Sequence, residues 1–285
     1  MTLFASPKDA QERLAAVGYL LDEQAAVTVY LAEPLSKPIL CEGPAGVGKT
    51  ELAKGLSEAS GRPLIRLQCY EGLDEAKAIY EWNYKKQLLR IQADSGETDW
   101  HKVEQDIFTE DFLLARPLLL AIKATRPVVL LIDEVDRLEE EAEALLLEVL
   151  SDWQVSVPEL GTVRATQVPL VVLTSNNTRE LSEALKRRCL FLPMNYPSIE
   201  REREIILRRV PGIEAALAEQ IARIVRSIRI LDLKKPPSVS ETLDWARTLV
   251  LLGHRSLDGG VPKDMLPLLL KYQQDIDKVA AELTP

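Results

Sequence analysis

Residues 43–50 read Gly43-Pro44-Ala45-Gly46-Val47-Gly48-Lys49-Thr50, which matches the pattern G-x-x-x-x-G-K-S/T at every fixed position. The apolar run Ile39-Leu40-Cys41 precedes this loop, and a segment with helical spacing follows it. A strand before the loop and a helix after it form the context that a phosphate-binding loop of this pattern requires. Glycines let backbone N–H groups turn toward a phosphate, and the start of the helix adds positive potential. The alternative interpretation is a glycine-rich turn without a ligand.

The loop therefore predicts a binding site for ATP with Mg²⁺. We expect Lys49 to reach the β- and γ-phosphates and the Thr50 hydroxyl to bind the metal ion. The backbone of residues 43–48 is expected to surround the phosphates. The next residue, Glu51, is counted among the nucleotide-binding residues.

A pair of acidic residues ends the most apolar segment of the chain. The run Val128-Val129-Leu130-Leu131-Ile132 lies between Pro127 and Asp133, a pattern typical of a strand that is buried on both faces in a parallel sheet. A carboxylate at such a strand end can hold Mg²⁺ through water, and a second one can orient and deprotonate an attacking water. We assign the first role to Asp133 and the second to Glu134. An acidic helix cap is the alternative.

The order of elements predicts the fold class. Strands are expected at residues 64–68, 168–174 and 190–192, helices at 7–33, 74–92 and 137–150, and a hairpin at 153–166. Strands that alternate with helices predict an α/β fold with a doubly wound parallel sheet. After Pro197 only helical patterns remain. We therefore expect a nucleotide-binding domain at 1–197, with a helical insert at about 70–116, and a smaller all-helical domain at 198–285.

Composition excludes several kinds of protein. The chain has 285 residues, 46% of them hydrophobic, and a net charge of −9, which disfavours a nucleic-acid partner. Its three cysteines, Cys41, Cys69 and Cys189, are too far apart to indicate a zinc site or a disulfide framework. No leader peptide is visible, nor an apolar run of the ~20 residues that cross a bilayer. We expect a cytoplasmic protein without a membrane span.

The loop at 43–50 and the segment Leu131-Ile132-Asp133-Glu134-Val135-Asp136 together resemble the AAA+ ATPases. The resemblance implies that Asn176, in Leu173-Thr174-Ser175-Asn176-Asn177, is the polar sensor-1 residue that positions the hydrolytic water. It also implies an arginine finger in the segment 181–189, with Arg188 the closer match and Arg187 the second. A solvated basic helix end is the alternative for these arginines.

The same resemblance implies a P-loop core with a helical C-terminal lid domain, and it places Val17-Gly18-Tyr19 against the adenine. Ordinary helix packing is the alternative for these three residues. The sensor-2 arginine that the family carries near Ser238 is missing, because the sequence there reads Lys234-Lys235-Pro236-Pro237-Ser238. Lys234, Lys235 and Arg247 are the candidate replacements.

Within this family the chain is most similar to the MoxR branch. The resemblance rests on residues 40–50, on Arg66-Leu67-Gln68-Cys69-Tyr70-Glu71-Gly72, and on Phe112-Leu113-Leu114-Ala115-Arg116-Pro117-Leu118-Leu119. The run Tyr80-Glu81-Trp82-Asn83-Tyr84 is similar to the CoxD-type members, which accompany carbon monoxide dehydrogenase-like molybdenum enzymes. The resemblance implies a homo-oligomeric ring, usually a hexamer, and a partner with a von Willebrand A-type (VWA) domain. It further implies a client metalloenzyme, a molybdenum hydroxylase, that the ATPase matures or activates.

Other functions share the same phosphate-binding loop. A small-molecule kinase would use it without a separate helical domain or an arginine offered to a neighbour. A nucleotide-dependent switch would bind ATP with little turnover, and the missing sensor-2 arginine favours that alternative. A DNA-handling member would need a basic face, which the net charge of −9 disfavours.

Overall fold

The computed structural model describes residues 3–93, 107–157, 160–258 and 260–282. At its centre lies a five-stranded sheet in the order β2-β5-β8-β1-β9, and every pair of neighbours is parallel. The strands are β1 (Ile39–Glu42), β2 (Leu64–Gln68), β5 (Val129–Asp133), β8 (Leu170–Ser175) and β9 (Leu190–Pro193). The expected parallel α/β fold is confirmed.

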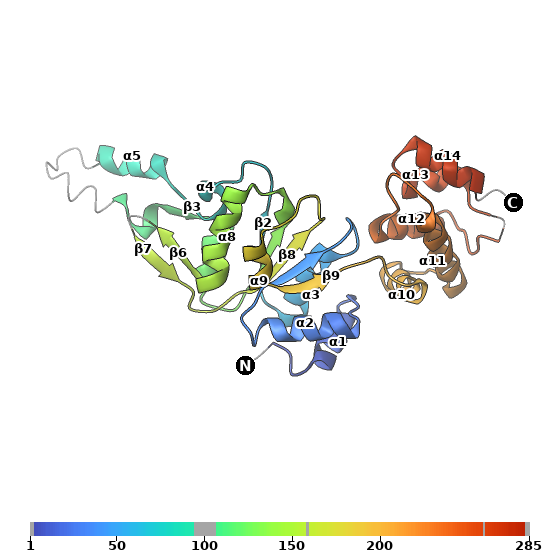
Figure 1. Cartoon of the computed structure of the whole chain (residues 1–285), viewed down its shortest axis with the longest axis horizontal. Coiled ribbons are helices and arrows are strands. Elements are labelled where there is room, and N and C mark those ends of the chain that lie inside the picture. The colour runs from blue at the N-terminus through green and yellow to red at the C-terminus, as the bar shows by residue number, and fades with distance from the viewer. Residues whose placement is uncertain (1–2, 94–106, 158–159, 259, 283–285) are drawn as a thin grey trace.

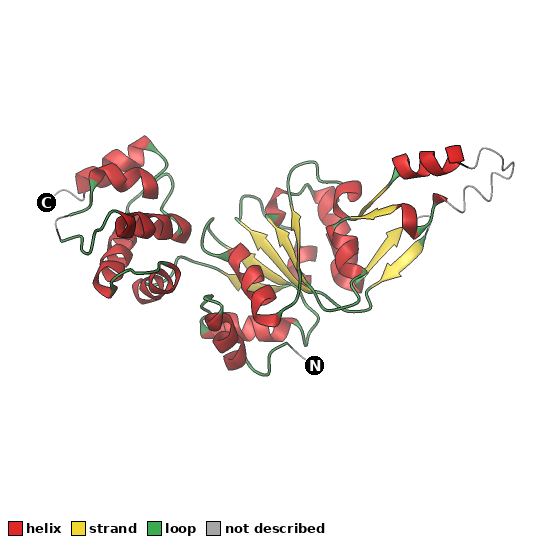
Figure 2. Ribbon diagram, turned by 180° about the vertical axis from the view of Figure 1, so that it is seen from behind, coloured by secondary structure: helices red, strands yellow, loops and turns green. Residues whose placement is uncertain are grey.

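Strand β5 shows why the sheet is covered by helices on both faces (Figure 2). All five of its residues are buried, and successive side chains alternate between the two faces. Val129 and Leu131 pack into a core with α1 (Pro7–Ala16), α2 (Glu23–Ala32) and α3 (Lys49–Ser60). Leu130 and Ile132 pack into the opposite core with α7 (Pro117–Ile122), α8 (Glu140–Asp152) and α9 (Glu183–Arg188). A strand between two apolar layers needs no polar face, which explains its unbroken apolar run.

The expected helix over 7–33 is divided into two, α1 and α2. Gly18 has φ +79, a left-handed conformation that an α-helix does not contain. Asp22 then caps the second helix, because its carboxylate accepts a hydrogen bond from the backbone N–H of Ala25 at 2.7 Å. The turn between the two helices carries Tyr19 toward the loop at 43–50, as described below.

The expected single helix over 74–92 is wrong in its middle. The segment contains α4 (Glu75–Ala78), the short strand β3 (Tyr80–Trp82) and α5 (Tyr84–Ala93). Strand β3 pairs antiparallel with β4 (Leu113–Ala115), and Trp82 packs edge-on against Phe108. This pairing partner lies about thirty residues away in sequence, so helical periodicity over 74–92 could not reveal it. Helix α5 projects from one end of the molecule (Figure 1). Residues 94–106 of the expected insert lie outside the described residues.

Four shorter elements complete the described part of this region. The turn η2 (Val135–Arg137) follows β5 directly and leads into α8. The strands β6 (Gln154–Val157) and β7 (Gly161–Arg164) pair antiparallel, which confirms the expected hairpin. The turn η1 (Glu110–Phe112) precedes β4.

The C-terminal part of the chain is helical, as expected. It contains α10 (Ile199–Arg209), α11 (Ala215–Ile230), α12 (Val239–Leu251), η3 (Lys263–Met265), α13 (Leu266–Leu269) and α14 (Gln273–Glu282). These helices have a core of their own around the fully buried Trp245. Figure 1 shows them grouped at one end of the elongated molecule, after the stretch that leaves β9. The domain boundary at 197/198 stays a prediction. In the described residues, none of the helices is long and apolar enough to cross a membrane.

Candidate functional site

A cavity of about 230 Å³ lies where β5 and β8 end. It brings together the loop at 43–50, the acidic pair after β5, the segment after β8 and the start of α12. Parallel strands end at one edge of the sheet, so segments far apart in sequence meet there. Its lining residues are Ala45, Gly46, Gly48, Lys49, Thr50, Glu51, Asp133, Glu134, Thr174, Asn176 and Ser240. The site roles of these residues stay predictions, but the structure places the expected ones side by side.

The loop at 43–50 is closely packed on both sides. A Cβ atom at Gly43 would collide with the carbonyl oxygen of Met194, just after β9. Gly46 has φ +73, and a Cβ there would collide with the side chain of Ser238, which caps α12. Both positions therefore require glycine. Gly43 leaves room for the close approach of the backbone at Met194, and Gly46 leaves room for Ser238 and also adopts a positive φ. The Ser238 contact joins the loop directly to the C-terminal helices.

Lys49 is buried inside the loop that carries it. Its ammonium group donates hydrogen bonds to the carbonyl oxygens of Gly43, at 2.6 Å, and Pro44, at 2.7 Å. Burial lowers the pKa of Lys49, while the negative charges of Asp136, Asp133 and Glu134 oppose that shift. A phosphate oxygen is a charged and stronger acceptor than the two carbonyls. The position fits a lysine held ready for a phosphate.

The expected Mg²⁺ ligands touch each other. The hydroxyls of Thr50 and Thr174 donate to the same oxygen, Oδ1 of Asp133, at 3.0 and 2.6 Å. Mg²⁺ prefers oxygen ligands and is usually held by one or two carboxylates with substrate phosphates and water. In the described residues, no group of three or more His, Cys, Asp or Glu side chains could hold a metal ion by itself. The arrangement thus fits Mg²⁺ bound together with a nucleotide through Thr50 and Asp133.

Strand β2 contributes polar residues that sequence reasoning missed. Arg66 donates to the second oxygen of Asp133 at 2.6 Å and also to Gln68. Gln68 in turn donates to Glu134 at 3.2 Å, and Arg137 pairs with the same oxygen of Glu134 at 3.1 Å. These contacts fix the direction of both carboxylates. The sequence does show that Gln68 ends a strand. That position indicates a contact with the acidic pair only when β2 is known to pair with β5, with Gln68 opposite Asp133.

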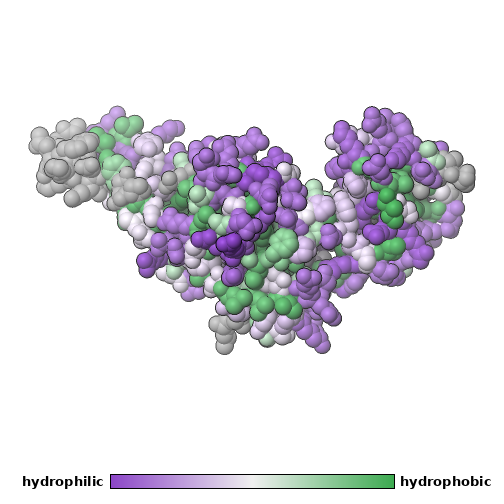
Figure 3. Space-filling model, in the orientation of Figure 1, coloured by the Kyte–Doolittle hydropathy of each residue, from purple (hydrophilic) through white to green (hydrophobic). Residues whose placement is uncertain are grey.

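A larger cavity, of about 680 Å³, adjoins the loop on the side of the C-terminal helices, and its size is typical of small-molecule sites. Gly18 and Tyr19 line it beside Gly48 and Glu51, whereas Val17 packs against the core under α1 to α3. The Tyr19 hydroxyl donates to the carbonyl oxygen of Gly48 at 3.3 Å. Burial raises the pKa of Tyr19, so the hydroxyl remains a donor. Figure 3 shows the hollow between the two parts of the molecule.

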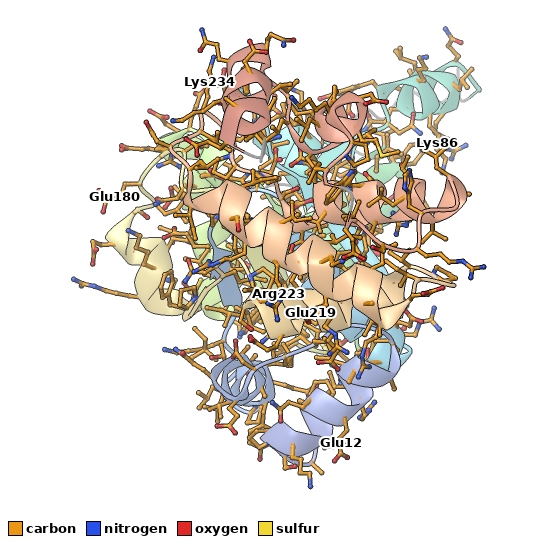
Figure 4. All side chains as sticks on the ribbon, turned by 90° about the vertical axis from the view of Figure 1, so that its right-hand side faces the viewer. Glu12, Lys86, Glu180, Glu219, Arg223 and Lys234 are labelled. Atoms are coloured by element: carbon orange, nitrogen blue, oxygen red, sulfur yellow. The ribbon has the colours of Figure 1, made fainter. Side chains whose placement is uncertain are left out.

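The candidates for the missing sensor-2 arginine lie in different places. Lys234 packs over the ring of Tyr272 at 4.2 Å, within the C-terminal helices, and Figure 4 shows it at the upper edge of the molecule. Lys235 pairs with Glu241 at 3.1 Å. Arg247 lines the larger cavity and pairs with Asp244 at 2.9 Å. Of the three candidates, Arg247 alone borders the cavity.

Comparison with known proteins agrees with this geometry. The model of the AAA domain (dynein-related subfamily) matches residues 38–189, more than half of the chain. The chain belongs to this AAA domain family. The matched range includes the loop at 43–50, the acidic pair and Asn176.

Two relatives of the AAA domain protein are about a quarter identical to it over the aligned residues. The gas vesicle ATPase GvpN of Haloferax mediterranei is 25% identical over 204 residues, which cover 68% of this chain and 57% of that protein. An uncharacterised protein of Staphylococcus haemolyticus is 26% identical, with 76% of each chain covered. A RuvB variant of Thermotoga maritima superposes with a TM-score of 0.50 at 16% identity, covering 98% of this chain and 71% of that one. The RuvB likeness shows the fold alone.

The two arginines of the AAA domain's α9 differ in their surroundings. Neither lines the two cavities described above. Arg188, the expected finger, donates to the Ser151 hydroxyl on α8 and to the carbonyl oxygen of Ala184 at 2.9 Å. Arg187 is 80% exposed and forms an ion pair with Glu183, on its own helix, at 3.6 Å. An exposed pair of this kind contributes little to stability, so Arg187 is the arginine that can turn toward another molecule.

Proposed function

We propose that this AAA domain protein binds ATP with Mg²⁺ and hydrolyses it. The observation that carries the proposal is the cavity of about 230 Å³ where Lys49, Thr50, Asp133, Glu134 and Asn176 meet. Lys49 would bind the β- and γ-phosphates, and Thr50 with Asp133 would hold Mg²⁺, which supplies charge neutralisation during phosphoryl transfer. Glu134 would take the proton of the attacking water, and Asn176 would orient that water.

We further propose that active sites are completed between subunits of a ring, with six subunits the expected number. Among the residues that line the smaller cavity, Lys49 is the only cationic side chain. Phosphoryl transfer is strongly accelerated when an arginine from a neighbour neutralises the charge that develops on the γ-phosphate. Arg187 fits this role better than Arg188, because Arg188 is held against α8 by Ser151.

The ring proposal predicts that ATP hydrolysis depends on assembly. The rate per subunit, measured with Mg²⁺ from dilute to concentrated protein, should rise as the protein assembles, and a sizing column run alongside should show oligomers over the same range. A rate that stays constant while the protein remains monomeric would contradict sites shared between neighbours. An assembled ring without turnover would instead favour the nucleotide-dependent switch.

We propose a place for this ATPase in the maturation of another enzyme. The support is the resemblance of residues 40–50, 66–72 and 112–119 to the MoxR branch and of residues 80–84 to its CoxD-type members. A VWA-domain protein would be the partner, and a molybdenum hydroxylase the client. The relative named as a gas vesicle ATPase is related at 25% identity only, so it does not decide the client.

The client proposal predicts a dependence of enzyme activity on this protein. A molybdenum hydroxylase encoded in the same genome, co-expressed with the wild-type chain and the VWA partner, should have a higher specific activity than with the Glu134→Gln variant. The hydroxylase protein should be equally abundant in both. Equal specific activity in the two co-expressions would contradict the client assignment without affecting the ATPase proposal.

A further inference from the structure

The segment from Asn176 to Ser182 connects the subunit's own ATP site to α9, the helix proposed to serve the neighbouring subunit. It begins beside the smaller cavity, with Asn176, and ends at Ser182, the cap of α9. Helix α9 carries Arg187, the residue proposed for the neighbour's site. At six residues, α9 is too short to be stable by itself, so its position depends on what holds it.

Asp136, in η2, holds the first half of this segment. One of its oxygens accepts hydrogen bonds from the backbone N–H groups of Asn176, at 3.1 Å, and Thr178, at 3.0 Å, and from the Thr178 hydroxyl at 2.6 Å. Burial by itself would raise the pKa of Asp136, but the hydrogen bonds from Thr178 and Asn176 outweigh it and hold the pKa below its ordinary value. Asp136 therefore stays charged and keeps Asn176 at the cavity.

Glu143, on α8, holds the second half. It is 2% exposed, and one oxygen accepts hydrogen bonds from the backbone N–H of Ser182, at 2.9 Å, and from the Ser182 hydroxyl. Its other oxygen accepts from Arg179 at 2.9 Å. The intervening Glu180 lies at the surface (Figure 4), where its 85% exposed side chain forms an ion pair with Lys186 of α9 at 3.3 Å. A buried carboxylate with three donors fixes the capping residue of α9 firmly.

Helix α9 is thus attached to α8 at both ends. Glu143 holds Ser182 at its start, and Ser151 near the end of α8 accepts from Arg188 at its last residue. Leu185 is fully buried between these two points. Arg187 lies on the same helix but is exposed. The position of Arg187 in space is therefore set by contacts that other residues of α9 and its cap make with α8.

We propose that Glu143 is a positioning residue for Arg187, and that it acts on the ATP site of the neighbouring subunit rather than on its own. The inference rests on the proposed function, since it requires a ring. Phosphoryl transfer depends on the placement of charge to within about an ångström. When Glu143 loses its charge, the start of α9 loosens and Arg187 no longer reaches the neighbour's γ-phosphate in the correct geometry.

The test uses mixed rings of two variants. Glu143→Gln should bind ATP within about twofold of wild type, which also shows that it folds, while its ATP hydrolysis falls roughly tenfold or more. Lys49→Ala has no working site of its own but keeps its α9 intact. In a 1:1 mixture, about a quarter of the interfaces combine a Glu143→Gln site with an α9 from Lys49→Ala, so the rate per subunit should recover to about a quarter of the wild-type rate.

Matched controls separate the possible outcomes. Glu180→Gln, in the same segment but exposed, should hydrolyse ATP like wild type. Arg187→Ala mixed with Lys49→Ala should also recover activity, because a site of the first variant can then receive an intact α9 from the second. If this control recovers and the Glu143→Gln mixture does not, Glu143 acts on its own site and the inference is wrong. If the Arg187→Ala mixture does not recover, the proposal that subunits share their active sites is wrong, and so is the inference that depends on it.

A second variant covers the case in which Glu143→Gln does not fold. Ser182→Ala removes one donor to Glu143 and the side-chain cap of α9, whose oxygen accepts from Leu185 at 3.2 Å, without leaving a buried charge unpaired. We expect a smaller loss of hydrolysis, with unchanged ATP affinity and the same recovery on mixing with Lys49→Ala. Unchanged hydrolysis in Ser182→Ala would contradict the positioning role.

Discussion

Replacing Lys49 by alanine is expected to weaken ATP binding on the order of 100-fold or more. The ammonium group is buried inside the loop and bonded to the carbonyl oxygens of Gly43 and Pro44, so it is already placed where a phosphate would bind. Hydrogen bonds to charged groups contribute about 1.5–3 kcal/mol each, and Lys49 would make them to two phosphates. Titration calorimetry with a non-hydrolysable ATP analogue and Mg²⁺ measures the change.

Lys123→Ala is the matched control for this variant. Lys123 is a surface lysine that pairs with Glu110 at 2.6 Å, far in sequence from the loop, and its loss should leave the affinity unchanged. Tight ATP binding that persists in a folded Lys49→Ala protein would remove residues 43–50 as the nucleotide site. Circular dichroism of the variant distinguishes lost binding from lost folding.

The change Glu134→Gln is expected to keep ATP binding and to lower hydrolysis by roughly 100- to 10,000-fold, the range associated with loss of a general base. Glutamine has nearly the same shape, so the contacts with Gln68 and Arg137 can adjust to it, but it cannot take a proton from water. The measurement combines steady-state hydrolysis at saturating ATP with an equilibrium binding titration of the same preparation.

Glu139→Gln serves as the control for Glu134→Gln. Glu139 is an exposed carboxylate just before α8, so its neutralisation should change neither binding nor turnover. If Glu134→Gln hydrolyses ATP at the wild-type rate, Glu134 is not the base. If both affinity and rate fall together, Glu134 contributes to binding, and Arg66 and Gln68 on β2 would have to be reconsidered with it.

The sequence was sufficient to predict the strands of the parallel sheet, because each strand is indicated by a short run of neighbouring residues. Four of the five strands show as short apolar runs, and β2 was expected at the residues where it is found. The loop at 43–50 also carries its own signal, since Gly46 must adopt a positive φ and Lys49 must follow it at a fixed distance in sequence. The helical C-terminal part followed from the absence of strand patterns after Pro197.

The expectations from the sequence are least complete where distant segments meet. Strand β3 was expected to be helical because its partner β4 is remote in sequence, and pairing with a remote strand can override local periodicity. The preference for Arg188 over Arg187 came from motif spacing, which does not show that Ser151 on α8 holds Arg188. Val17 was grouped with Gly18 and Tyr19, although only the latter two reach the larger cavity.

The sequence by itself determined the fold class and which residue types could serve a nucleotide: the glycines and Lys49 of the loop, Asp133 with Glu134, and Asn176. The tertiary structure decided which partners these residues have: Arg66 and Gln68 beside the carboxylates, Asp136 beneath Asn176, and Glu143 at the start of α9. The physical reason is strand order. A motif records spacing along one chain segment, whereas hydrogen bonds between neighbouring strands and helices depend on which segments the sheet places next to each other.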